Sequence, residues 1–301
     1  MLDKKIYNLI KEKDFSSISP LELRPFFWGS LEVYDKEIQR RLSEYESKYD
    51  LLHWMSHWTE KKRLISPFKG NKIYEEIKKK SSISHINVFE YLFSKEIVNK
   101  KLHNGYDIYN AIDGYLINKH CKGVSTTLDF GSGYGRLGCI LGQKNSKMTY
   151  ISVDCIERSY LLQNLFLSLF APKRFYEYFD FRFENKEFKI LKGNNIYHLP
   201  TWKMEIIKNN SVDLITAVFV LNEINEFALN HFINQARRVL RKGGYIYIKD
   251  HLYQTGEKSH KGAHKNNTEV ELKKAGFDII FQGNYKDDQE IFGIPRILKK
   301  K

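Results

Sequence analysis

The stretch Thr127-Leu-Asp-Phe-Gly-Ser-Gly-Tyr-Gly-Arg136 decides the fold that we predict for this chain. Its first residues, Thr127-Leu-Asp-Phe130, are predicted to end a strand, and they continue into three alternating glycines, Gly131, Gly133 and Gly135. Glycine lets the backbone turn tightly and approach a ligand closely, because no Cβ is in the way. The sequence therefore predicts a strand, a glycine-rich turn and a helix, with a cofactor bound at the turn.

Two acidic residues accompany this turn. Asp129 stands near the end of the predicted strand, where its carboxylate could accept hydrogen bonds from an amino group, directly or through water. Asp154 ends the next predicted strand, about 20 residues further on, and we expect it to accept hydrogen bonds from both hydroxyls of a ribose. Its neighbours Cys155 and Ile156 are then placed to flank an adenine.

The glycine spacing alone leaves two cofactors open. Gly133-x-Gly135-x-x-Gly138 also fits the dinucleotide fingerprint, with Asp154 at a suitable distance. Two observations favour S-adenosylmethionine over a nicotinamide dinucleotide. The predicted strand ends at Phe130, so that Gly131 is the first glycine of the turn, and Asp129 stands where the dinucleotide pattern has an apolar residue. A pyrophosphate would also be repelled by that carboxylate.

The rest of the chain indicates an α/β fold behind a helical region. From residue 124 onward short apolar runs alternate with helical periods, as in a parallel sheet with crossover helices. We predict strands at 125–130, 149–153, 188–191, 212–218 and 245–249, and a helix at 226–240. Before residue 122, apolar residues recur every three or four positions, which predicts helices at 31–49, 88–101 and 107–119.

In these features the chain resembles the class I S-adenosylmethionine-dependent methyltransferases. The resemblance rests on several segments in order, namely Leu128–Gly135, Asp154, Gly193-Asn194, Leu199-Pro200, Val212–Glu223 and Ala236–Ile248. It implies a Rossmann-like sheet in a cofactor-binding domain at 123–301. It also implies that Asn194, with Asn195 beside it, lies near the adenine in place of the usual carboxylate. Residues 1–122 are then a helical N-terminal extension and a candidate cover for the substrate.

A narrower resemblance points to the substrate. The helical extension and the string Ile291-Phe-Gly-Ile-Pro-Arg296 are similar to bacterial sugar O-methyltransferases of surface-polysaccharide pathways. This similarity implies that the acceptor is a sugar hydroxyl on a glycan or nucleotide-sugar precursor. The segment after residue 218 lacks the Asn/Asp-Pro-Pro-aromatic tetrad of many amino-group methyltransferases, and no Pro-Cys nucleophile occurs, so oxygen is the favoured acceptor.

Methyl transfer to a hydroxyl usually needs a group that takes the proton. We predict His251 as general base, with Asp250 orienting it or binding the sugar, because both directly follow a predicted strand, where α/β folds open their crevice. Glu223 is the second candidate. His260 and His264 have the spacing of a metal pair on a helix but no third ligand, so we predict no metal ligands and leave the metal requirement open.

Composition limits the partners and the compartment that we expect for the protein. The formal net charge of +13 does not exclude RNA, although no RNA-binding module is recognisable, and we expect no DNA partner. The three cysteines have no paired spacing, which suits a reducing, cytoplasmic compartment. The sequence contains no run of 18 apolar residues, so we predict no membrane span. Peripheral membrane contact and the oligomeric state stay open.

The competing functions are a methyltransferase of RNA or of another small molecule, a nicotinamide-dependent oxidoreductase, and a fold that binds S-adenosylmethionine without turnover. Salt-sensitive RNA binding would favour the first of these. Selective binding of NAD would favour the second.

Overall fold

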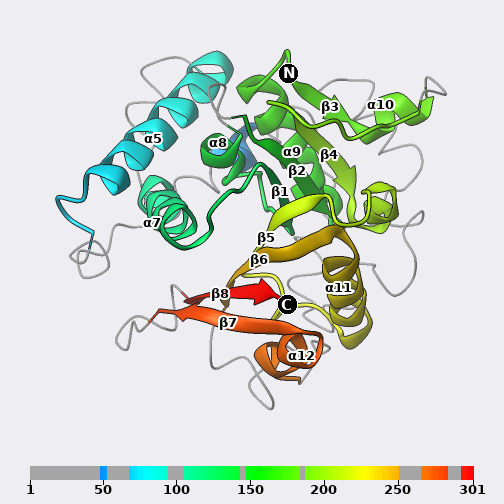
Figure 1. Ribbon diagram of the computed structural model, residues 1–301. Helices are drawn as coiled ribbons and strands as arrows, with labels where there is room; N and C mark the ends of the chain where they lie inside the picture. The colour runs from blue at the N-terminus through cyan, green and yellow to red at the C-terminus, as the bar shows by residue number, and fades with distance from the viewer. Residues whose placement is uncertain are drawn as a thin grey trace.

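The computed structural model of the protein describes residues 48–52, 68–93, 105–142, 147–183, 187–250, 266–283 and 293–301. Their strands form one eight-stranded sheet in the order β3-β4-β2-β1-β5-β6-β8-β7 (Figure 1). The strands are β1 (Thr126–Phe130), β2 (Thr149–Asp154), β3 (Phe175–Glu177), β4 (Ile196–Pro200), β5 (Val212–Val218), β6 (Leu240–Asp250), β7 (Phe277–Gln282) and β8 (Ile294–Lys300). All pairings are parallel except those of β8 with β6 and β7.

Helices cover both faces of this sheet. The described helices are α5 (Lys72–Leu92), α7 (Gly105–His120), α8 (Gly138–Leu141), α9 (Glu157–Phe170), α10 (Tyr178–Phe183), η4 (Thr201–Ile206), α11 (Glu226–Val239) and α12 (Thr268–Lys274). Helices α5, α7, α8 and α9 share one apolar core with Tyr150 and Tyr247, whereas η4, α11 and α12 share another with Ile151 and Ile246. Neighbouring strand residues thus point to opposite faces. The predicted α/β class and Rossmann-like sheet are confirmed.

The burial of the central strands explains why the sequence predicted their positions correctly. Every residue of β1, β2 and β4 is buried, since both faces of a parallel sheet are covered by crossover helices. Such strands appear in a sequence as short, nearly continuous apolar runs. The predictions at 125–130, 149–153, 212–218 and 245–249 fall on β1, β2, β5 and β6, and the helix predicted at 226–240 is α11.

The strand predicted at 188–191 is wrong. These residues are in irregular structure, and the strand that pairs with β2 is β4, eight residues later. Phe188 packs on the rings of Tyr178 and Tyr197 instead of joining the sheet. The true strand was harder to recognise because a buried histidine, His198, interrupts its apolar pattern and Pro200 ends it.

The start of α5 was not predicted. Its buried face carries Ser81, Ser84 and His85, whereas an amphipathic helix is recognised from an apolar stripe. The helix predicted at 107–119 lies within α7. The helix predicted at 88–101 overlaps α5 only as far as Leu92, and the one at 31–49 lies almost entirely outside the described residues.

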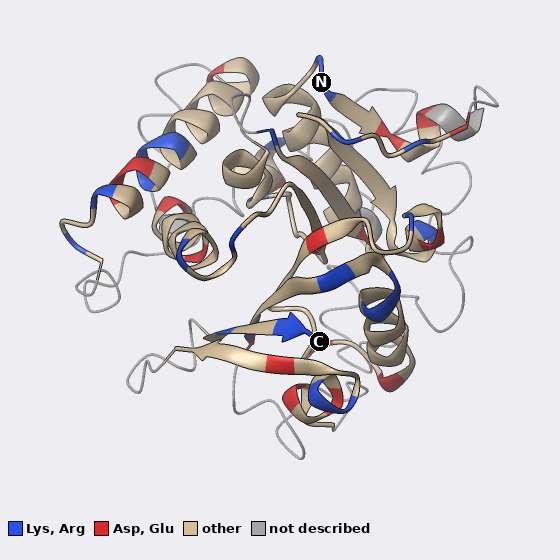
Figure 2. Cartoon of the chain, viewed as in Figure 1, with Lys and Arg blue, Asp and Glu red and all other residues tan. Residues whose placement is uncertain are grey.

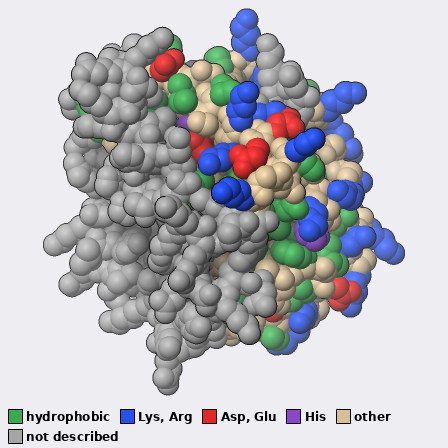
Figure 3. Space-filling model, turned by 90° about the vertical axis from the view of Figure 1, so that its left-hand side faces the viewer, with side chains coloured by type: hydrophobic (Ala, Val, Ile, Leu, Met, Phe, Trp, Pro, Cys, Tyr) green, Lys and Arg blue, Asp and Glu red, His purple; other side chains and the backbone are tan. Residues whose placement is uncertain are grey.

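Basic residues of α11, β6 and β8 lie close together at the amino edge of the sheet. Figure 2 shows Lys and Arg at the end of α11, at the start of β6 and at the end of β8. Lys300 Nζ donates to the carbonyl oxygens of Arg237 and Leu240 at 2.5 and 2.6 Å. On the face shown in Figure 3, basic side chains of the described residues lie among acidic and hydrophobic ones. None of the described helices is long and apolar enough to cross a membrane.

Candidate functional site

The carboxyl edge of the sheet gathers most of the predicted site residues. Strands β4, β2, β1, β5 and β6 lie side by side and run in the same direction, so their last residues share one edge. The glycine-rich turn follows β1, Asp154 ends β2, and Asp250 ends β6. Ligands of open α/β sheets bind outside such an edge.

Gly131 brings the ends of β1 and β5 together. Its φ is 66°, in the left-handed region, and a Cβ there would lie 2.5 Å from Cγ2 of Val220. Its N–H donates to the carbonyl of Val153 at 3.0 Å, which ties the turn to β2 as well. Only glycine meets both the dihedral and the steric requirement at this position.

Asp154 is buried and already hydrogen-bonded. Its Oδ1 accepts from the backbone N–H groups of Cys155 and Ile156 at 2.9 and 3.0 Å, and its Oδ2 accepts from Gln163 Nε2 at 2.8 Å. Burial raises the pKa of Asp154 to about 7, although these three donors lower it. A carboxylate offers roughly four acceptor positions, so about one remains for a ligand hydroxyl.

Gln163 of α9 is a site residue that the sequence reasoning missed. Besides Asp154, its Nε2 donates to the carbonyl of Gly133 at 2.9 Å. Its Oε1 accepts from Ser152 Oγ at 2.7 Å, and that hydroxyl lies 2.5 Å from Ser132 Oγ. One buried amide therefore holds the glycine-rich turn and the acid of β2 together. The available signal was a glutamine inside a mainly apolar stretch of sequence that begins soon after Asp154.

The side chain of Asp129 is buried and contacts side chains of the two neighbouring strands. Its oxygens accept hydrogen bonds from Tyr150 at 2.5 Å and from Thr216 at 2.7 Å, and burial raises its pKa. The carboxylate thus lies between side chains of β2 and β5, two residues before the first glycine of the turn. A contact with a ligand amino group stays a prediction.

The end of β5 carries strained backbone and unpaired polar atoms. Phe219 has a φ of 57°, which is uncommon for a residue other than glycine and is often found at functional sites. Three residues later, the Asn222 side chain is buried, and neither its Oδ1 nor its Nδ2 has a hydrogen-bond partner among the described residues. A buried amide without a partner is costly, which points to a ligand that would satisfy it.

Asp250 lies close to this segment. It is 4% exposed, and neither carboxylate oxygen has a hydrogen-bond partner within the described part of the chain. Burial raises its pKa to about 7, opposed by the positive charge of Arg296 and by the backbone N–H groups of Val220 and Asn222, which lie nearby without forming hydrogen bonds of normal geometry. Asp250 pairs with Ile294 of β8, so the described part of the C-terminal string, residues 293–296, lies next to the end of β6.

Glu223 lies close enough to Asp250 for the two acids to affect each other's ionisation. Burial and the negative charge of Asp250 raise the pKa of Glu223 to about 8. Two carboxyl groups of this kind cannot both ionise easily at neutral pH, so they can hold and release a proton there. The structure thus brings together two of the three predicted catalytic residues; the third, His251, lies outside the described residues, as do His260 and His264.

The placement of Asn194 and Asn195 near the adenine is wrong. Both precede β4, and Asn195 O accepts from the N–H of Tyr150 near the start of β2, so they lie at the amino edge of the sheet. Asn194 instead accepts hydrogen bonds from Arg174. Since Asp154 pairs with Pro200, the residues that follow β4 at the carboxyl edge are Thr201 and Trp202. The misplaced strand caused this error.

Among the residues that the structure describes, no three His, Cys, Asp or Glu side chains are grouped so as to hold an ion.

Comparisons with known proteins give distant similarities. No family model matches the chain. O-methyltransferase 3 of Dictyostelium discoideum is 24% identical over 127 residues, which are 37% of this chain and 27% of that protein. An S-adenosylmethionine-dependent methyltransferase from Aquifex aeolicus aligns with a TM-score of 0.41 and 18% identity, over 63% of this chain and 90% of that one. A second from Archaeoglobus fulgidus aligns with a TM-score of 0.41 and 13% identity, over 64% and 94%.

Proposed function

We propose that the protein is an S-adenosylmethionine-dependent methyltransferase that acts on oxygen, with a sugar hydroxyl of a glycan or nucleotide-sugar precursor as acceptor. One observation carries the proposal. A glycine-rich turn with a buried acid on the neighbouring strand lies at the same sheet edge as Asp250 and Asn222, whose buried polar atoms have no partner among the described residues. A cofactor site and an acceptor site would thus be adjacent.

The residues at the turn fit an adenosyl cofactor better than a dinucleotide. A dinucleotide places its pyrophosphate on the N-terminus of the helix after the turn, but α8 has only four residues and thus a weak dipole. The carboxylate of Asp129, two residues before the turn, would repel a pyrophosphate, whereas it suits a cationic ligand.

In this proposal each part of the site has a task. Asp154, oriented by Gln163, accepts a hydrogen bond from a ribose hydroxyl, and Cys155 and Ile156 flank the adenine. Bound S-adenosylmethionine supplies an activated methyl group on a sulfonium. The chain's contribution is then to hold the acceptor oxygen in line with the methyl group and to exclude water.

The acceptor hydroxyl must lose a proton during the transfer. Asp250 is suited to take it, since a base works best with a pKa near the operating pH, and the pKa of Asp250 is about 7. His251 directly follows it and is the other candidate for this role. The amide of Asn222 can both donate to and accept from neighbouring hydroxyls, as a polyhydroxyl acceptor requires.

The cofactor is tested by titration calorimetry with S-adenosylmethionine, S-adenosylhomocysteine and NAD, on the wild type and on Asp154→Ala. Binding of both adenosyl ligands, weakened by the substitution, supports the proposal. Binding of NAD alone overturns it.

The acceptor is tested by following methyl transfer from labelled S-adenosylmethionine to nucleotide sugars, to glycan precursors and to RNA. Label on a sugar hydroxyl supports the assignment. Label on RNA, lost at high salt, would replace it with a nucleic-acid substrate.

A further inference from the structure

We propose that Asp113 of α7 is a positioning residue, which fixes the glycine-rich turn and the end of β6 relative to each other through one buried carboxylate. The inference rests on the proposed function in that these two segments form the cofactor and acceptor sites. It also gives helix α7 a part in the active site beyond that of a cover over the substrate.

Three donors from two distant segments meet on Asp113. Its Oδ2 accepts from Arg136 at 2.6 Å, and its Oδ1 accepts from Tyr247 at 2.6 Å and from Lys249 at 2.9 Å. The Asp113 side chain is fully buried, and that of Lys249 is 3% exposed. The pKa of Asp113 lies below its usual value in spite of burial, because Lys249 and Arg136 stabilise the carboxylate.

The donors connect directly to the proposed site. Arg136 follows Gly135, the last glycine of the turn, and Lys249 precedes Asp250. Lys249 Nζ also lies 5.7 Å from the ring centroid of Phe219, the residue with the strained backbone at the end of β5. A shift of Asp113 would therefore be transmitted to the ends of β1, β5 and β6.

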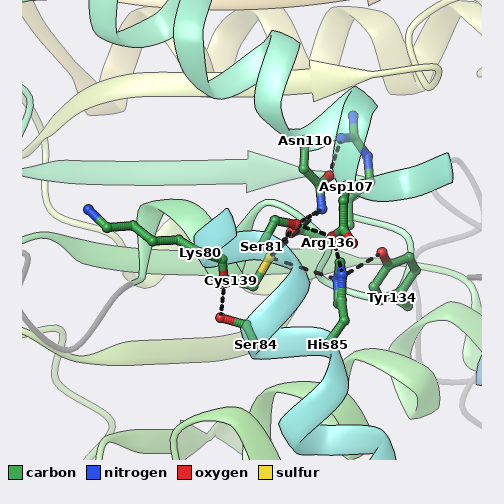
Figure 4. A network of polar contacts seen from close by, with 9 residues as sticks. All are labelled: Lys80, Ser81, Ser84, His85, Asp107, Asn110, Tyr134, Arg136 and Cys139. Atoms are coloured by element: carbon green, nitrogen blue, oxygen red, sulfur yellow. Dashed lines mark hydrogen bonds and ion pairs between the residues drawn. The ribbon is translucent and has the colours of Figure 1, made fainter. Parts of the chain in front are cut away.

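A second buried group holds the other side of Gly135. Figure 4 shows His85 of α5 between Asp107 and Tyr134. His85 Nδ1 lies 2.7 Å from Asp107 Oδ1, and Tyr134 OH lies 3.3 Å from His85 Nε2. The same network reaches Arg136, whose Nη1 donates to Asn110 at 2.8 Å. Residues of α5 and α7 thus hold both neighbours of Gly135.

The loss of the Asp113 charge should have a large effect because the groups that it pairs with are charged and buried. Removing one partner of a buried ionic network leaves an uncompensated charge, whereas an exposed pair would matter little. In Asp113→Asn, the cations of Arg136 and Lys249 lose their shared counter-charge, so both segments should loosen even where the global fold persists.

The test compares two variants by hydrogen exchange of the full chain without ligand. Asp113→Asn should speed exchange of the amides at 131–136 and 247–250 by on the order of ten-fold relative to other strands. The matched control is Glu177→Gln, which removes the charge of a similarly buried carboxylate that contacts His198 and Asn164 at the β3–β4 edge of the sheet, away from β6. The control should lower stability and leave those amides unchanged relative to the rest.

Binding gives the second readout, and Arg136→Lys guards against a variant that does not fold. Lysine keeps the charge but cannot reach Asn110 and Asp113 together, so the affinity for S-adenosylhomocysteine should fall about ten-fold with little change in melting temperature. Unchanged exchange at 131–136 and 247–250 in both Asp113→Asn and Arg136→Lys overturns the positioning role. If the wild type does not bind the adenosyl ligands, the proposed function fails, while the exchange result still decides the role of Asp113.

Discussion

Gln163 of α9 donates a hydrogen bond from Nε2 to Oδ2 of Asp154 at 2.8 Å and holds the carboxylate at the end of β2. The same nitrogen reaches the carbonyl of Gly133, so the acid and the glycine-rich turn are set by one side chain. The electrostatics of this acid give the proposed cofactor site a dependence on pH.

We expect S-adenosylhomocysteine to bind more tightly as the pH rises from 6 to 8. The pKa of Asp154 is about 7 without ligand, and the ionised carboxylate accepts a hydroxyl hydrogen bond better than the protonated one. Titration calorimetry across this range measures the effect. Asp154→Asn cannot ionise and should bind weakly with a flat profile; an equally steep profile in this variant would assign the dependence to another group.

Gly131→Ala should destabilise the protein by about 2 to 4 kcal/mol, because a steric clash with Val220 adds to the cost of a left-handed alanine. The control is Gly70→Ala, where φ is also positive at 79° but a Cβ meets nothing within 4 Å. Chemical denaturation measures both variants. Val220→Ala in the Gly131→Ala background should recover part of the loss, and equal losses at Gly70 and Gly131 would contradict the clash.

Asp250→Asn should lower the rate of methyl transfer by roughly 10²- to 10⁴-fold, as expected for loss of a group that takes a proton. The same substitution should raise the melting temperature at pH 8, because it removes a buried charge with no hydrogen-bond partner among the described residues. Activity assays and calorimetry test the two effects. Asp278→Asn, which alters an exposed acid of β7, should change neither.

The ligand-free protein should lose stability as the pH rises from about 5 to 9. Asp154, Asp250 and Glu223 have pKa values of about 7, 7 and 8 in the folded protein, which lie above the ordinary pKa values of these side chains. The folded state therefore binds more protons than the unfolded state at intermediate pH. The stabilisation that this gives at low pH is lost as the pH rises through the folded-state pKa values. Burial alone would lower the pKa of His85, but the Cys139 sulfur and Asp107 raise it to about 9. A histidine with a raised pKa stabilises the fold at pH values below its pKa in the unfolded chain. This stabilisation is lost as the pH rises towards 9.

Urea unfolding at pH 5.5, 7 and 8.5 measures this trend, which we expect to amount to several kcal/mol, since each of the four groups alone contributes roughly 2 kcal/mol or more over this range. Asp250→Asn should make the profile shallower. A free energy of unfolding that rises over this range would contradict the raised pKa values.

The sequence by itself determined the α/β class, the glycine-rich turn, the acid at the end of β2 and most of the central strands. These features are local. A buried parallel strand shows as a short apolar run, a left-handed turn requires glycine, and an acid at a strand end follows from its place in the chain. The same reasoning also located Asp250 at the end of its strand and Glu223 after its strand.

Only the tertiary structure decided which polar side chains meet inside the protein. Asp113 and Lys249 are 136 residues apart, and no periodicity relates them. The first part of α5 was missed because its buried face is polar, and β4 was misplaced because its histidine is satisfied by Glu177 from another strand. A buried polar group is tolerated only where the fold supplies its partner, so its place cannot be inferred before the fold is known.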